Sequence, residues 1–450
     1  MDHYDVITIG AGGAAYPAAF KLKRSGRSVL MIDKKGVMSG NCLSEGCVPS
    51  KAIIENVHNY VKMKRFGDYS LDYEKLVYLK DHVQDIRYKQ HAVELSEAGL
   101  SIKKGNARLV DDHTVSVDDG TGTVSYSADH IIIASGSDTF IPKFPGAELA
   151  LTSSSFYSVS PKVRHLPKSI TIIGGGYIGM ETASFLSLLG TKVYVIEMLS
   201  KPLATMDPEP VDALMPLLPQ CEYYMNSAVK SIERVADGYR VSFDHNGSME
   251  HIDSEFVMLA AGRAPVIPEG TEELGIKYQK SGIIVNEGMQ TNIRNIYATG
   301  DVNGITPLFH AAKRQSVVAA NNILAGDILV DYFDPVSVPF TIFTVPQLSF
   351  VGILPEQAKR ENIKFTTAEF SLDHDAMAQI NGEMFGKIKL LVDSRMKIIG
   401  GYVIGNDAGN IINEIALAIS KGLNIRDFAE MAHQHPMTFE ELDSIGRQFY

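Results

Sequence analysis

The sequence predicts an α/β protein of several domains, and three observations support this. A strand–turn–helix–strand pattern begins at Tyr4 and recurs at Ile170, so one supersecondary unit is present twice. From about Pro339 the pattern changes, and short strand-like runs mix with helical ones. The 450 residues also exceed what one ordinary core accommodates. We therefore expect two βαβ-containing domains followed by an α+β domain.

Each of the two units is built in the same order. The first has an apolar run at 4–9, the glycine-rich turn GAGGAA, an alanine-rich helical stretch, and a second apolar run at 28–33. The second starts at 170–173, continues through GGGYIG and a helical stretch, and ends in KVYVIE at Glu197. Apolar runs of this length joined by a tight turn and a helix are typical of buried parallel strands.

Between and after these units, the pattern indicates further elements. An amphipathic stretch over 73–99 predicts a long helix, a turn at 119–122 predicts a hairpin, and 131–133 predicts a buried strand. A meander is expected over 229–253 and a buried strand over 256–260.

The C-terminal region is expected to form the third domain. Its strand-like runs lie at 387–391 and 398–404, and its helical runs lie at 410–421 and 427–433.

Composition excludes several classes of protein. The net charge of −11, without a lysine- or arginine-rich stripe, argues against nucleic-acid binding. No apolar run reaches the ~18 residues that a membrane span needs, and a strand that begins at Tyr4 leaves no room for a leader. Three cysteines in 450 residues do not make a secreted disulfide scaffold. We expect a cytoplasmic protein that binds neither membranes nor nucleic acids.

Both units contain a dinucleotide-binding fingerprint with an acid 23 residues after the first glycine. The first glycine makes the turn, the second lets a pyrophosphate approach, and the third position lets helix and strand pack. The helix N-terminus favours phosphate, and the acid accepts from ribose hydroxyls. At the second site this carboxylate would repel a 2′-phosphate, which favours NAD over NADP. The fingerprint residues are Gly10, Gly12, Ala15 and Asp33 in the first unit, and Gly174, Gly176, Gly179 and Glu197 in the second.

Cys42 and Cys47 form a close pair in the segment GNCLSEGCVPSK. A zinc site is disfavoured because Cys221 is remote and no histidines flank the pair, so we predict no metal. A disulfide would require the segment to depart from regular helix, because five helical residues rise ~7.5 Å, and Gly46 is placed to permit this. On spacing alone, two buried unpaired thiols remain an equal alternative.

GNCLSEGCVPSK resembles the redox-active motif of the class I pyridine nucleotide–disulfide oxidoreductases. The resemblance covers essentially the whole chain, since both fingerprints, the ATGDV segment at 298–302 and the C-terminal HPMTFEE occur in the family's order. It implies an FAD-binding domain, an NAD-binding domain and a C-terminal dimerisation domain. The implied boundaries are 1–146 with 265–338 for FAD, 147–264 for NAD, and 339–450 for dimerisation.

The resemblance also implies roles for residues around the cysteines. Cys42 would be the interchange thiol that attacks substrate, and Cys47 would lie against the flavin as the charge-transfer thiol. Lys51 would lie near the flavin with Glu181 as its partner, and Asp301 would bind the ribitol chain.

Further roles follow for the second half of the chain. Arg263 would touch cofactor or form a structural ion pair. His435 would be the acid/base that acts on the other subunit's cysteines in a homodimer, oriented by Glu440 five residues later. His433 is expected to be a helix-end or interface residue. The chain departs from the family's pattern at Met437, Ser39 and Asn41, which concerns how substrate approaches the cysteines and not the class of reaction.

Within the family, the closest resemblance is to the archaeal-like branch that oxidises a dihydrolipoyl dithiol and reduces NAD⁺. Its partner would be a lipoyl-bearing acyltransferase or lipoyl carrier protein. Glutathione-type reductases carry arginines where this chain has Glu197 and Leu203, and mercuric reductases add a C-terminal cysteine pair that is absent after Cys221. An NADH-dependent reductase of another small disulfide remains an alternative, as does a dinucleotide-binding protein without activity.

Overall fold

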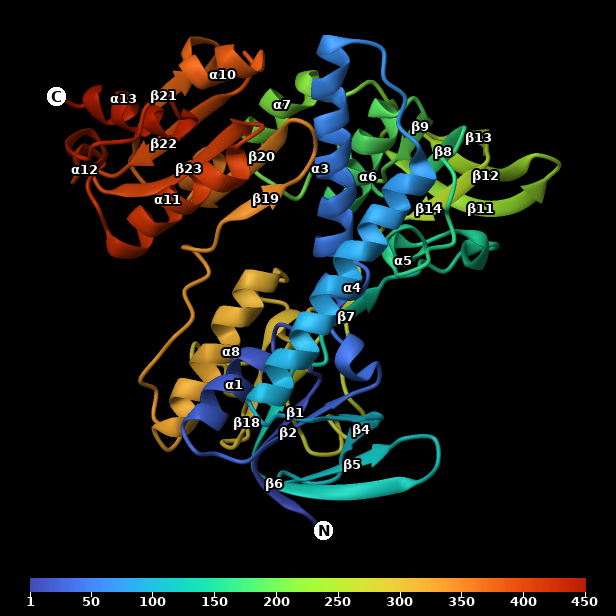
Figure 1. The fold of residues 1–450 in the computed structure, drawn as a ribbon, viewed down its shortest axis with the longest axis vertical. Helices are drawn as coiled ribbons and strands as arrows, with labels where there is room; N and C mark the ends of the chain where they lie inside the picture. The colour runs from blue at the N-terminus through green and yellow to red at the C-terminus, as the bar shows by residue number, and fades with distance from the viewer.

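The computed structural model describes residues 1–450 and has three units (Figure 1). The N-terminal unit lies at the bottom of the view, the second unit lies at the upper right, and the C-terminal unit lies at the upper left. Two long helices run between them. None of the helices combines the length and the apolar character that crossing a membrane requires.

The first sheet is built on the first predicted βαβ pattern. Strands β1 (His3–Ile9) and β2 (Val29–Asp33) pair in parallel, and β6 (Thr123–Ile133) pairs in parallel with the other side of β1. Strand β18 (Ile296–Ala298), which follows the whole second unit in sequence, pairs in parallel with β6. The remaining strands of this sheet are β3 (Ile102–Lys104), β4 (Asn106–Leu109) and β5 (Thr114–Asp118).

Helices cover this sheet and fix the position of its glycine-rich turn. Helix α1 (Tyr16–Arg24) packs against α8 (Phe309–Leu324), and the backbone N–H of Ala18 donates to the Ser316 hydroxyl over 2.9 Å. Segments nearly 300 residues apart in sequence therefore form one layer of the first unit.

The second sheet repeats the arrangement. Its strands lie in parallel in the order β10-β9-β8-β14, and α6 (Tyr177–Leu188) packs on it as an almost wholly buried helix. The predicted meander forms a separate antiparallel sheet. The strands are β8 (Ser169–Ile173), β9 (Lys192–Ile196), β10 (Glu222–Tyr224), β14 (Phe256–Leu259), β11 (Ser227–Val235), β12 (Gly238–His245) and β13 (Ser248–Ser254).

The chain passes between these two units at one place. Strand β7 (Ser137–Thr139) leads away from the first unit, β15 (Arg263–Pro265) leads back, and the two pair antiparallel. The two segments in which the chain crosses between the units, β7 and β15, therefore lie side by side.

The two long helices are α3 (Cys47–Met63) and α4 (Tyr73–Glu97). Their apolar side chains Ile53 and Leu76 belong to the same core as Phe185 of α6, so these helices join the first unit to the second. The structure confirms the predicted helix beginning at Tyr73, although its buried face also contains charged and amide side chains.

The third unit contains a five-stranded antiparallel sheet in the order β19-β20-β23-β22-β21, and the predicted strands at 387–391 and 398–404 are confirmed as β22 and β23. The predicted helix over 427–433 is displaced, because α12 covers Ile425–Glu430. A capping box formed by Asn424 and Asp427 starts the helix earlier, and the backbone is already extended at Met431. The elements are β19 (Phe340–Ile342), β20 (Gln347–Gly352), β21 (Thr366–Ser371), β22 (Lys387–Val392), β23 (Ile398–Gly405), α11 (Ala408–Lys421), α12 (Ile425–Glu430) and α13 (Glu441–Arg447).

Short elements complete the chain. They are α2 (Asn41–Ser44), α5 (Ser153–Tyr157), α7 (Pro208–Leu214), α9 (Pro355–Arg360), α10 (Ala376–Asn381), β16 (Tyr278–Gln279) and β17 (Gly282–Ile283).

Candidate functional site: a dithiol beside a dinucleotide cavity

The segment between the two cysteines is a broken helix. Cys42 lies in α2, Cys47 is the first residue of α3, and the helix is interrupted between them at Gly46. A Cβ atom at Gly46 would stand 2.8 Å from the carbonyl oxygen of Asn41, so only glycine allows this close approach. The prediction that the segment is not regular helix is confirmed. The structure contains both cysteines as free thiols, with Cys42 half-buried and Cys47 exposed.

The two thiols differ in their ionisation. The hydrogen bond from Cys42 lowers the pKa of Cys47, and the charge of Lys51 lowers it further against burial and Glu181. The same hydrogen bond, together with burial, raises the pKa of Cys42. The N-terminus of α3 adds a positive dipole at Cys47. Cys47 is therefore the cysteine of the reduced pair that ionises more readily.

Lys51 lies one turn into α3 from Cys47 and is paired as predicted. Its Nζ is 2.7 Å from Oε2 of Glu181, and it lies 4.4 Å from the centre of the Phe343 ring. The other oxygen of Glu181 accepts from the backbone N–H of Phe343 over 2.9 Å. Glu181 is only 5% exposed, so a buried carboxylate from the second unit fixes this cation beside the thiols.

A cavity of about 900 Å³ opens in front of the dithiol. It extends from the first fingerprint, past the cysteines, to α6 of the second unit, which is large enough for a dinucleotide. Of the predicted site residues, the cavity brings together Gly12, Asp33, Cys42, Cys47, Lys51, Glu181, Arg263 and Asp301.

A polar network lines the cavity where the two chain crossings meet. Ser137 donates its hydroxyl to Asp301 over 2.6 Å, and Arg263 donates to the hydroxyl and carbonyl oxygens of Ser137 at 2.9 and 2.7 Å. The Asn41 amide donates to the same carbonyl over 2.6 Å. Arg263 thus lines the cavity and is held in place there by its hydrogen bonds to Ser137. Because Ser137 donates to only one Asp301 oxygen, the other can accept from a ligand hydroxyl.

The first fingerprint has the shape that a pyrophosphate requires. Gly10 adopts φ +109°, where a Cβ would lie 2.2 Å from the carbonyl oxygen of Ala134. Ala15 is fully buried in the contact between α1 and the sheet. Asp33 accepts from the backbone N–H of Ala11 at 3.2 Å, and burial raises the pKa of this carboxyl against its backbone hydrogen bonds.

The second fingerprint has the same left-handed first glycine as the first. Gly174 adopts φ +112°, and a Cβ at Gly179 would lie 2.1 Å from the Gly174 carbonyl oxygen, whereas a Cβ at Gly176 would meet nothing within 4 Å. The open position is where a pyrophosphate would approach. Glu197 accepts from the backbone N–H of Gly175 over 2.6 Å. Both sites therefore fit dinucleotides, and their acids are held by equivalent backbone hydrogen bonds.

His435 and Glu440 form the predicted pair, but far from the thiols of their own chain. Nδ1 of His435 is 2.9 Å from Oε2 of Glu440, and the histidine side chain is 71% exposed. The segment between α12 and α13 that carries them lies on the outer side of the third unit, away from α3 (Figure 1). His435 does not line the cavity.

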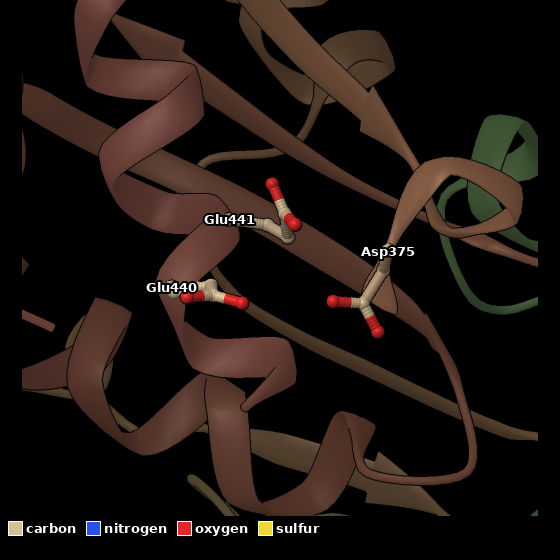
Figure 2. Close-up of side chains that lie close together, drawn as sticks. All are labelled: Asp375, Glu440 and Glu441. Carbon is tan, nitrogen blue, oxygen red and sulfur yellow. The ribbon is translucent and has the colours of Figure 1, made fainter. Parts of the chain in front are cut away.

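Two further acids, Glu441 and Asp375, lie close to Glu440 (Figure 2). One carboxylate oxygen from each of Asp375, Glu440 and Glu441 lies within 4.8 Å of the other two, and Asp375 is fully buried. Burial, and then the charges of Asp375 and Glu440, raise the pKa of Glu441. Oδ2 of Asp375 accepts from the backbone N–H of Ala378 over 2.6 Å and from the Thr438 hydroxyl over 3.2 Å, which anchors this buried carboxylate.

His433 takes no part in the site. Its Nε2 is 3.1 Å from Glu414, its side chain is 3% exposed, and its ring packs edge-on against Phe428. These contacts agree with the structural role expected for it.

Several residues at the site were not found from the sequence. Ser137 joins Asp301 to Arg263, and Phe343 covers Lys51. Ser137 follows the carboxyl end of β6, a position where ligand-binding residues gather, so its place could have been noticed. Phe343 has no comparable signal, because its position depends on the third unit folding back onto α6.

Comparison with known families agrees with this geometry. Residues 4–316 match the pyridine nucleotide-disulphide oxidoreductase family, and residues 338–445 match that family's dimerisation domain. The chain is 32% identical to a dihydrolipoyl dehydrogenase from Geobacillus stearothermophilus over 96% of this chain and 93% of that protein. It is 29% identical to a leghemoglobin reductase from Vigna unguiculata over 100% and 88%, respectively.

Solved structures share the fold. The HOCl-induced flavoprotein disulfide reductase RclA from Escherichia coli, solved as a Cu(II) complex, superposes with a TM-score of 0.89 at 22% identity, covering 100% of both chains. LpdA from Mycobacterium tuberculosis gives the same TM-score, identity and coverage. The cofactors of the matching family are FAD and NAD(H), which the two fingerprint sites have the residues to hold. The chain is a member of the pyridine nucleotide-disulphide oxidoreductase family.

Proposed function

We propose that the protein is an NAD-dependent dihydrolipoyl dehydrogenase that works through Cys42 and Cys47. The observation that carries the proposal is that Cys42 and Cys47 both line the large cavity, with Cys47 at the start of α3 and Lys51 one turn further along the helix. The names of the relatives that cover nearly the whole chain support the same activity.

The first half-reaction is thiol–disulfide exchange. One thiolate of the substrate attacks Cys42 of the oxidised pair, the bond between the two cysteines breaks, and Cys47 leaves as a thiolate. The second substrate sulfur then displaces Cys42, which closes the substrate disulfide and leaves the enzyme as a dithiol. The lowered pKa of Cys47 suits it to the leaving role, and Lys51 stabilises the charge that develops there.

The second half-reaction returns the pair to the disulfide. The first fingerprint, Arg263 and Asp301 would hold FAD, which when bound would supply the two-electron chemistry that joins the dithiol to NAD⁺. Overall, one dithiol and one NAD⁺ give one disulfide, one NADH and one proton. The residues proposed to hold NAD⁺ are Gly174, Gly176, Gly179 and Glu197.

Proton transfer requires a group that one chain does not bring to the cysteines. We place His435 of a partner subunit there, with Glu440 holding its Nδ1 so that Nε2 faces the substrate thiol. The match of 338–445 to a dimerisation domain supports a homodimer. A lipoyl-bearing acyltransferase or lipoyl carrier protein would present the dithiol, and the small number of cysteines, three in the chain, favours the cytoplasm as the place of action.

The division of the chain into domains follows the two crossings. We place the FAD domain at 1–146 and 265–338, the NAD domain at 147–264 and the interface domain at 339–450. The pairing of β18 with β6 and of β7 with β15 supports a discontinuous first domain.

A second candidate is an NADH-dependent reductase of another small disulfide. The cavity that holds Cys42 is also lined by Arg87, His91 and Glu94 of α4, and such charged side chains would suit a more polar substrate than lipoamide.

Steady-state kinetics separates the two candidates. Dihydrolipoamide with NAD⁺ or NADP⁺ should be compared with lipoamide, coenzyme A disulfide and glutathione disulfide with NADH or NADPH. We expect the highest kcat/KM for the dihydrolipoamide–NAD⁺ and lipoamide–NADH pairs. A higher kcat/KM with a charged disulfide and NADH would replace the proposed function by the second candidate.

A further inference from the structure

The break between the cysteines leaves backbone carbonyl groups without helical partners. Helix α2 ends at Ser44, so its last carbonyls have no intrahelical donor. One side chain of α4 donates hydrogen bonds to two of these carbonyl groups. Gln84 donates its amide to the carbonyl oxygens of Leu43 and Ser44, both at 2.9 Å.

A buried lysine fixes the orientation of that amide. Lys80, one turn earlier on α4, donates from Nζ to Oε1 of Gln84 over 2.9 Å. Because a lysine can only donate, the oxygen of Gln84 must face Lys80 and its amide N–H groups must face the loop between the cysteines. Both side chains are fully buried.

Lys80 is in turn anchored on the second unit. Its Nζ donates to the carbonyl oxygens of Ser158 at 2.7 Å and Tyr157 at 3.3 Å, and it is paired with Asp81. The Tyr157 hydroxyl lies 2.9 Å from Thr182, the residue after Glu181. A charged group in this interior is costly unless it has several partners, so the site is specifically built.

We propose that Gln84 and Lys80 are positioning residues that hold the loop between Cys42 and Cys47 while the pair alternates between dithiol and disulfide. This inference rests on the proposed function only in assuming that the pair cycles. When the bond forms, the sulfurs close to ~2.05 Å, and a loop anchored at Leu43 and Ser44 keeps the two sulfurs in register for this closure. A loosened loop lowers the effective concentration of one sulfur at the other and favours the dithiol.

The test measures the dithiol–disulfide equilibrium in the purified holoenzyme. The fraction of the Cys42–Cys47 disulfide is followed in glutathione buffers of graded potential by trapping free thiols and by mass spectrometry. Gln84→Leu should shift the equilibrium towards the dithiol at least about tenfold, which corresponds to about 30 mV for two electrons. Gln84→Glu keeps the partner of Lys80 but loses the donors to the loop, and should shift it in the same direction.

Three further variants separate positioning from folding. Lys80→Met should behave as Gln84→Leu does, and Lys80→Arg should restore most of the wild-type equilibrium. Lys89→Met removes an exposed lysine of the same helix, whose side chain is 75% exposed in an ion pair with Asp85, and should change nothing. Thermal unfolding identifies the variants that are folded at the temperature of the measurement.

The outcomes are distinguishable. If the wild type forms no Cys42–Cys47 disulfide at any potential, the proposed function itself fails. If the wild type forms it, but folded Gln84→Leu or Gln84→Glu has the wild-type equilibrium, only the positioning role is overturned. Should Gln84→Leu fail to fold, Gln84→Glu and the comparison of Lys80→Met with Lys80→Arg decide the question.

Discussion

Nζ of Lys51 and Oε2 of Glu181 are 2.7 Å apart, which joins the helix that begins at Cys47 to helix α6 of the second unit. The ion pair spans 130 residues of sequence, and it places a fixed positive charge next to the thiolate. The reactivity of the cysteines thus depends on contacts between units as well as on the redox motif.

Removing this charge should make Cys47 less acidic. In Lys51→Met, the attraction that lowers the pKa of Cys47 is lost, so we expect the pH midpoint of its alkylation by iodoacetamide to rise and turnover at pH 7 to fall at least about tenfold. Lys64→Met, beyond the other end of α3, is the control and should leave both unchanged. An unaltered alkylation midpoint in Lys51→Met would contradict the electrostatic role.

Both cysteines of the pair should be essential, whereas the third should not. Cys42→Ser and Cys47→Ser each remove one sulfur of the exchange, and each should abolish NADH formation from dihydrolipoamide. Cys221 hydrogen-bonds to Ser187 in the second unit, so Cys221→Ser should keep wild-type turnover. Full turnover by either of the first two variants would rule out the proposed exchange.

The proposed use of His435 across a dimer can be tested by mixing chains. His435→Gln should lower turnover by about 10²–10⁴-fold, the usual range for a general acid–base group. When His435→Gln and Cys42→Ser chains are unfolded and refolded together in equal amounts, half of the dimers should be mixed, and each mixed dimer should have one complete site. Activity should therefore recover to about a quarter of the wild-type value. No recovery in verified mixed dimers would mean that the histidine does not act across the interface.

Glu383 should connect the far end of α3 to the third unit in a pH-dependent way. Burial raises its pKa, but hydrogen bonds from His58, Asn406 and Lys62 outweigh this and lower it to about 2. A carboxyl with a lowered pKa stabilises the fold above the unfolded-state value near 4.5, and this stability is lost as the pH falls towards 2. Glu383→Gln should cost about 2–3 kcal/mol at pH 7 and almost nothing near pH 2, as measured by urea unfolding. The control is Glu356→Gln, at an exposed ion pair, and it should cost less than about 1 kcal/mol. An equal loss for Glu383→Gln at both pH values would refute the linkage.

Glu197 should set the preference between the two nicotinamide coenzymes. Its carboxylate is held by the backbone N–H groups of Gly175 and Leu199, at 2.6 and 2.8 Å, where a 2′-phosphate would meet a negative charge. Glu197→Ser should raise the ratio of kcat/KM for NADP⁺ to that for NAD⁺ at least about tenfold, or about 1.4 kcal/mol. Asp212→Ser is the control: it removes an exposed carboxylate that pairs with Lys201, and it should leave the ratio unchanged. If the ratio of kcat/KM for NADP⁺ to that for NAD⁺ does not change in Glu197→Ser, this carboxylate does not determine the coenzyme preference.

Much of the site could be predicted because its signals are local. A glycine at φ +109° or +112° and an acid 23 residues later define each nucleotide-binding turn within one βαβ unit. The broken helix between the cysteines was expected from spacing and from Gly46, and the pairing of Lys51 with Glu181 followed from resemblance. The residues that sequence reasoning did not find make their contacts with parts of the chain that are far away in sequence. Ser137 meets Arg263 because β7 and β15 pair, and Gln84 meets the loop because α4 packs beside α2.

The sequence by itself determined the two nucleotide-binding turns and the proximity of Cys42 to Cys47, because backbone sterics and short spacing act within a few residues. Only the tertiary structure decided that Phe343 covers Lys51, that Ser137 meets Arg263, and that Gln84 binds the carbonyls of Leu43 and Ser44. Those features depend on hydrogen bonds and charges between residues far apart in sequence, and such contacts exist only once the three units pack together.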